Sequence, residues 1–229
     1  MGNIAGILFG LIGLAIPILI IAAIVYSILR IKSGISLSIS YKAALRVYFY
    51  IVILVSVGLT GVGGVSTLIN VGLGEMVGRE FSYGEVYQDH RELQDLKNNG
   101  DSSSYVVGDS RSLSEKIELE MKGSLINGIS LAVIGSFLML VHFLGRRWVE
   151  TVDEHSDLLR RLYLIAGLAI FAVITIVSLI AGIPETLRYA LLEVEPGQES
   201  PGEALSIAIV GLPIWVSYLV ATLRNVRSQ

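Results

Sequence analysis

The feature that most constrains this chain is a run of twenty uncharged residues, Ala204–Leu223, which is closed by Arg224 and Arg227. A helix rises about 1.5 Å per residue and must cross about 30 Å of hydrocarbon, so about 20 apolar residues span a membrane. Four further runs without Asp, Glu, Lys or Arg are long enough: Ile4–Leu29, Val47–Gly74, Gly123–Gly145 and Leu162–Ile183. The sequence therefore predicts an all-α integral membrane bundle of five transmembrane helices.

Composition supports the membrane class. Charged residues make up 16% of the chain, against about 25% in a soluble domain. The chain has no cysteine, which excludes disulfides, thiolate metal sites and thiol nucleophiles. A net charge of −3 suggests no polyanion as partner, and we expect no nucleic-acid binding. The run Met1–Leu29 lacks a basic start and is too long for a signal-peptide core, so we interpret it as a retained membrane helix.

Basic residues gather in segments that alternate spans place on one side of the membrane. Arg30–Arg46, Arg146–Arg161 and the tail after Leu223 hold 10 of the 17 basic residues and only four of the 20 acids. The positive-inside rule then predicts a plasma-membrane protein with its N-terminus outside and its C-terminus in the cytoplasm.

The spans divide the chain into an N-terminal transmembrane helix at 1–32, a first membrane hairpin at 41–148 with a long outer loop at 75–122, and a second hairpin at 156–229. Within the loop, Glu85–Asn99 predicts a short helix. Ser112 and Glu115 have the spacing of a capping box, which predicts a helix from Leu113 into the next span. The loop has few large apolar residues, so we expect a partly ordered cap. Pro184 predicts the start of a new short helix, Glu185–Val194.

The two hairpins look like copies of one unit. The matched pairs are Ser130/Ser206, Ala132/Ala208, Gly135/Gly211 and His142/Tyr218 at an offset of 76, and Arg46/Arg161, Tyr48/Tyr163 and Thr60/Thr175 at an offset of 115. We interpret them as a parallel repeat about an axis along the membrane normal. Coincidence between isoleucine-rich spans is the alternative.

The second hairpin opens with Arg161–Tyr163 and closes on Gly211–Trp215 followed by Tyr218. These segments resemble the bacterial membrane domain of unknown function DUF5671. In the first copy Phe137 and Met139 replace the proline and tryptophan of that pattern, and His142 stands at the position of the family's histidine. The resemblance covers about Tyr41–Arg227 if both copies count. The family has no assigned activity, so the resemblance implies architecture and leaves function open.

Small residues recur at spacings that let helices approach closely. The helix-packing candidates are Gly6, Gly10, Ser56, Thr60, Gly64, Gly135 and Gly211. A hinge or an ion path is the alternative reading of the stripe from Ser56 to Gly64. Basic and aromatic residues at the inner span ends are predicted interface anchors: Arg146, Arg147, Trp148, Trp215 and Tyr218.

The search for catalytic and metal-binding residues yields little. The three histidines, His90, His142 and His155, have no metal-ligand spacing. Ser66 lies about 30 Å along its span from the inner end and His142 about 6 Å, so the two cannot form a dyad. His142 is the candidate functional residue inside the spans, with snorkelling to the interface as the alternative. We expect no catalytic residues, no metal site and no cofactor.

These observations favour a non-catalytic membrane protein, an accessory or assembly subunit or scaffold. Its expected partners are lipid and either other membrane subunits or further copies of itself. The alternative is a small oligomeric channel or transporter.

Overall fold

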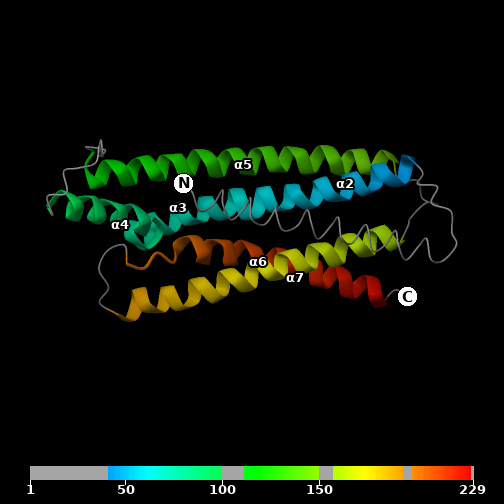
Figure 1. Ribbon diagram of the computed structural model, residues 1–229. Coiled ribbons are helices and arrows are strands. Elements are labelled where there is room, and N and C mark those ends of the chain that lie inside the picture. The colour runs from blue at the N-terminus through cyan, green and yellow to red at the C-terminus, as the bar shows by residue number, and fades with distance from the viewer. Residues whose placement is uncertain (1–40, 99–110, 150–156, 193–197, 228–229) are drawn as a thin grey trace. The chain divides into compact units, whose positions relative to one another are not determined.

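The computed structural model describes residues 41–98, 111–149, 157–192 and 198–227 (Figure 1). The chain divides into two compact units, Met1–Ala44 and Leu45–Gln229, and the second is described here by itself. Within the described ranges every regular element is a helix, which confirms the all-α prediction there. The predicted span Ile4–Leu29, with Gly6 and Gly10, lies outside the described residues.

Four helical runs among the described residues are long and apolar enough to cross a membrane: Ala44–Met76, Leu113–Val149, Leu159–Leu191 and Gly202–Arg227. Each contains one predicted span, so four of the five predicted spans are confirmed as helices. These long apolar helices indicate a membrane-embedded protein. Each helix outruns its uncharged stretch because a helix can continue into the polar region beyond about 30 Å of hydrocarbon.

The first of these runs changes helical type in its middle. It consists of α2 (Tyr41–Gly58), the π-helix η1 (Leu59–Val65) and α3 (Ser66–Met76). The π segment reads LTGVGGV, and its three glycines are buried. Glycine loses much conformational freedom in a helix and has no side chain to pack, so this glycine-rich stretch is where the hydrogen-bond pattern of the run departs from the α type.

Residues 79–98 of the predicted outer loop form more helix than the sequence predicts. Gly78 turns the chain with a φ of +150°, and α4 (Arg79–Asn98) follows, six residues earlier than the predicted helix at Glu85. Phe81 and Tyr83 are buried, in a helix that contacts α3, α5 and α7. The expected cap is therefore docked on the bundle, because its two aromatic side chains find apolar surface on the spans.

Helix α5 (Leu113–Val149) begins at the predicted capping box. The backbone amide of Glu115 donates to Ser112 Oγ at 3.3 Å, and the backbone amide of Ser112 donates to a carboxylate oxygen of Glu115 at 2.8 Å. Both interactions satisfy amides that a helix start leaves without an intrahelical acceptor. The prediction that this helix runs directly into the span is confirmed.

Helix α6 (Asp157–Leu191) continues through Pro184, so the predicted separate helix Glu185–Val194 is wrong. The Thr186 hydroxyl donates to the carbonyl of Gly182 at 2.6 Å beside the proline. Side-chain hydroxyls and close neighbours let membrane helices tolerate proline. Helix α7 (Gly202–Arg227) likewise passes through Pro213, and Ser217 donates to the Pro213 carbonyl at 2.7 Å.

The helices pack as two pairs side by side (Figure 1). Helix α6 lies along α7, α5 lies along η1 and α3, and α7 joins the pairs by packing against α3 and η1. The core of the α6–α7 pair is Leu164, Phe171 and Tyr218, against which Leu54 and Val57 of α2 also pack.

Candidate functional site

The first pair of helices is joined near its arginine-rich end by Tyr48 of α2 and His142 of α5. The Tyr48 hydroxyl lies 3.1 Å from Nε2 of His142, and Nδ1 of His142 lies 2.7 Å from the carbonyl oxygen of Leu138. A carbonyl only accepts, so Nδ1 carries the proton and Nε2 accepts from Tyr48 in the neutral ring. The Phe49 ring packs edge-to-face with the His142 ring, and the centroids of these two rings are 6.0 Å apart.

The second pair is joined at its corresponding end by Tyr163 of α6 and Tyr218 of α7. The two hydroxyls are 2.7 Å apart. The Tyr218 ring fills the space where a Cβ on Gly167 would stand, and it stacks on Phe171 with centroids 5.5 Å apart. The bond therefore depends on glycine at position 167.

About two to three helical turns from the tyrosine contacts, each pair has a threonine packed against a glycine. A Cβ built on Gly135 of α5 would collide with Thr60 Oγ1, and one built on Gly211 of α7 would lie 2.7 Å from Thr175 Oγ1. Glycine at these two positions therefore leaves room for the threonine of the neighbouring helix.

These two threonines differ from seven other hydroxyl residues of the described helices. The hydroxyls that return to the carbonyl four residues earlier belong to Ser56, Ser66, Thr67, Thr186, Ser206, Ser217 and Thr222. Thr60 Oγ1 and Thr175 Oγ1 are buried and have no conventional hydrogen bond among the described residues. Each instead faces the glycine of the opposite helix.

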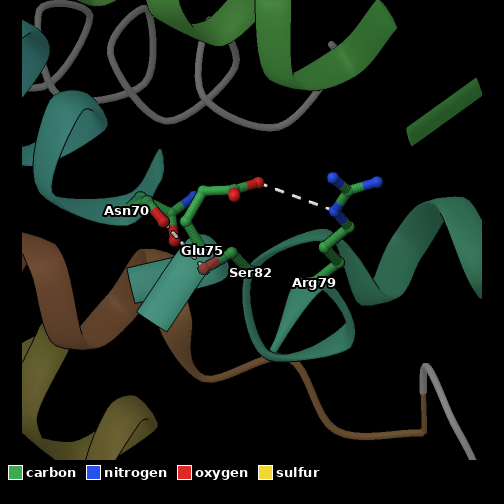
Figure 2. Close-up of polar contacts among 4 residues, drawn as sticks. All are labelled: Asn70, Glu75, Arg79 and Ser82. Carbon is green, nitrogen blue, oxygen red and sulfur yellow. Dashed lines mark hydrogen bonds and ion pairs between the residues drawn. The ribbon is translucent and has the colours of Figure 1, made fainter. Parts of the chain in front are cut away.

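At the end of the bundle that carries α4, the helices meet at Gly202, the first residue of α7. A Cβ at this position would lie 2.6 Å from both Asn70 Oδ1 and Ser82 Oγ, and 2.8 Å from the Phe81 carbonyl oxygen. Figure 2 shows Ser82 donating to the backbone carbonyl of Asn70 at 2.8 Å, while Glu75 and Arg79 form an ion pair at 3.6 Å across the same turn. Three oxygens thus converge on one glycine, which holds α3, α4 and α7 together.

Helix α4 bends at Tyr83, whose backbone leaves the helical region at φ −126° and ψ 32°. The amide of Gly84, released by the bend, donates to Ser200 Oγ at 3.2 Å. Burial raises the pKa of the Tyr83 hydroxyl to about 12, with Glu120 and Glu75 adding to the rise and Arg79 opposing it. The phenol is therefore neutral at physiological pH.

No three His, Asp or Glu side chains in the described ranges lie close enough together to hold a metal ion. The polar contacts described above join helices to one another.

The predicted packing residues fall on helix contacts where the structure describes them. Ser56 is fully buried, and a Cβ on Gly64 would lie 2.5 Å from the backbone nitrogen of Ala132. The guanidinium of Arg146 lies 4.7 Å from the centre of the Tyr50 ring, and that of Arg147 lies 5.4 Å from the Phe143 ring.

The predicted aromatic anchors fall in three different environments. Trp148 is 89% exposed, Trp215 packs against the core of the α6–α7 pair, and Tyr218 is buried in that core. Interface anchoring stays a prediction for all five anchor residues.

Sequence reasoning missed the junction of α3, α4 and α7 at Gly202. Ser82 and Gly202 make close contacts at this junction, and Gly167 makes one with Tyr218 in the α6–α7 pair. None of the three was among the predicted site residues. The pair Pro201–Gly202 was the available signal, because a glycine at the start of a long helix leaves room for another backbone to approach.

One family model matches part of the chain. Residues 105–203 match the family model of a domain of unknown function, DUF5671. The resemblance inferred from the sequence is confirmed over that segment. The DUF5671 match covers α5 and α6 and ends at the first turn of α7. It includes Arg161–Tyr163 and His142, whereas the Gly211–Trp215 motif lies beyond it. Neither a curated protein nor a solved structure matches the chain.

Proposed function

We propose that the protein is a non-catalytic scaffold or accessory subunit of a membrane complex, built from two copies of one helical hairpin. The first copy is α2, η1 and α3 with α5, and the second is α6 with α7. One observation carries the proposal: the tyrosine contact and the threonine–glycine contact occur in both pairs, at positions that the offsets of 115 and 76 match.

The use of polar groups inside the spans favours a structural role. Intramembrane ionisable residues usually mark substrate or proton paths. Here His142 has both ring nitrogens in hydrogen bonds to its own hairpin. Seven hydroxyls bond to carbonyls of their own helix, and those of Thr60 and Thr175 face a neighbouring glycine. Groups committed to packing leave little for chemistry or transport, so we infer that the protein has no catalytic activity of its own.

The proposed orientation places the arginine-rich ends in the cytoplasm of a plasma membrane. Arg46, Arg146, Arg161 and Arg224 lie at the ends of α2, α5, α6 and α7 that the two tyrosine contacts bring together. The opposite end carries α4 and its acidic residues. The positive-inside rule supports this orientation. Reporter fusions at both chain ends test it, and a C-terminal reporter active outside the cell contradicts it.

Isolation of the protein from its own membrane in mild detergent tests the function. A stoichiometric membrane partner is the expected result. The purified protein is also placed in liposomes for ion and solute flux measurements. Flux that Thr60→Val or His142→Gln abolishes would support a channel or transporter and reject the scaffold.

A further inference from the structure

We propose that two copies of this chain form a dimer in which α5 of each copy docks on α6 of the other. The inference rests on the two-hairpin organisation proposed above. One interface between the two hairpins has no equivalent elsewhere among the described helices.

That interface joins the second hairpin to the first. A Cβ on Gly61 of η1 would lie 2.6 Å from Ile214 and 3.4 Å from Val210 of α7. Leu54 of α2 packs on the core of the α6–α7 pair. The second helix of one hairpin thus docks on the first helix of the other.

The repeat offsets transfer this interface to a second pair of faces. Val210 and Ile214 of α7 correspond to Ile134 and Leu138 of α5. Leu54 and Gly61 correspond to Ala169 and Ile176 of α6. The equivalent interface is therefore α5 against α6. Within the described helices these two lie on opposite sides of the bundle, and no comparable backbone contact joins them (Figure 1).

The unfilled α5 face is exposed where its α7 equivalent is covered. Ile134 is 55% exposed and Ile126 is 65% exposed, whereas Gly202, which corresponds to Ile126, is buried. Ser130 is exposed, whereas its equivalent Ser206 is 1% exposed.

The α6 face is open in the same way, and α5 carries an exposed amide beside its open face. Ile176 of α6 is 47% exposed, Ile165 is 55% exposed, and Ala169 is exposed as well. Beside the α5 face, the amide of Asn127 is also exposed. Hydrocarbon offers an amide no hydrogen-bond partner, whereas a neighbouring helix does.

A second copy fills both faces at once. A two-fold axis along the membrane normal brings α5 to α6 of the partner and α6 to α5 of the partner. With this axis, the α5 face and the α6 face of both chains are covered in the dimer. Neither face is left free to bind a third chain. Four hairpins then follow one another around the axis, each docked as α7 docks on η1.

Disulfide trapping tests the dimer, and the chain is suited to it because it has no cysteine. A chain with Ile134→Cys and one tag is expressed together with a chain that carries Ile176→Cys and a different tag, and the membranes are oxidised. The expected product is a cross-linked pair carrying both tags. The matched control is Ser136→Cys with Ile176→Cys, which gives no cross-link because Ser136 lies about 200° around the helix from Ile134. Both α5 positions are exposed, so neither change disturbs a buried contact.

The mass of the purified full chain gives the second readout. A particle of two chains is expected, and a monomer overturns the dimer, as does a disulfide from position 134 to a cysteine introduced within residues 1–40 of the same chain or to a different protein. A monomer with a stoichiometric foreign partner rejects the dimer and keeps the scaffold function. A cross-linked dimer that has no partner and conducts ions keeps the dimer and rejects the scaffold.

Discussion

The hydroxyl of Tyr163 lies 2.7 Å from the hydroxyl of Tyr218, and this contact joins α6 to α7 as the contact between Tyr48 and His142 joins α2 to α5. Apolar side chains alone fix little of the axial register of two membrane helices, because lipid is as apolar as they are. One polar bond between the helices of each pair fixes that register.

Tyr163→Phe is expected to destabilise the protein by about 1 kcal/mol, the net contribution of a typical hydrogen bond. Tyr218→Phe is expected to cost the same, and the double variant no more than either single variant, because the two hydroxyls share one bond. Unfolding in detergent measured by circular dichroism checks all three. Tyr41→Phe is the control, since that side chain is 81% exposed. Additive losses in the double variant would show that the two hydroxyls act separately.

Gly64→Ala is expected to destabilise the bundle by about 1–3 kcal/mol, the usual cost of overpacking. The added Cβ would lie 2.5 Å from the backbone nitrogen and 2.7 Å from the Cα of Ala132, and backbone cannot move aside cheaply. Gly58→Ala is the matched control in the same helical run, because nothing lies within 4 Å of its Cβ position. Equal unfolding temperatures for the two variants would contradict the close approach of η1 and α5.

The parts of this fold that follow periodic patterns could be predicted from the sequence. Uncharged runs located four described spans, because hydrocarbon tolerates few charges. The start of α5 followed from Ser112 and Glu115, whose side chains cap the helix by a local rule. The matched tyrosines and threonines were visible as an alignment, and the alignment says which residues correspond. It does not say that Tyr48 touches His142 or that Thr60 touches Gly135.

The rest depends on contacts between distant segments. Pro184 reads as a helix start, yet α6 continues through it, because tertiary packing overrides a local signal. Phe81 and Tyr83 do not look like core residues in a polar loop, and they are buried only because α3, α5 and α7 offer them a surface. No local pattern distinguishes the π-helix η1 from ordinary glycine-rich packing.

Gly202→Ala is expected to loosen the junction of α3, α4 and α7 and to cost about 1–3 kcal/mol, by the same overpacking. Its Cβ would meet Asn70 Oδ1, Ser82 Oγ and the Phe81 carbonyl oxygen within 2.8 Å. The local effect is read by hydrogen exchange in α4, which should accelerate over residues 79–84 and leave α5 near Gly135 unchanged. Gly72→Ala, with nothing within 4 Å of the added carbon, is the control. Unchanged exchange in α4 would mean that the junction does not hold this helix.

Tyr83 makes stability depend on pH in the alkaline range. Burial raises its pKa to about 12 in the folded protein, and the negative charges of Glu120 and Glu75 add to the rise. An unfolded tyrosine ionises near pH 10. The folded state therefore holds the proton more tightly. Its contribution is fully present below pH 10 and is lost as the pH rises towards 12. Absorbance of tyrosinate in the folded protein, compared between the natural chain and Tyr83→Phe, should show one phenol missing from the last part of the titration. The unfolding temperature of the natural chain should fall more steeply between pH 10 and 12 than that of Tyr83→Phe. Parallel curves for the two proteins would mean that the phenol ionises at its ordinary pH and that α4 does not bury it.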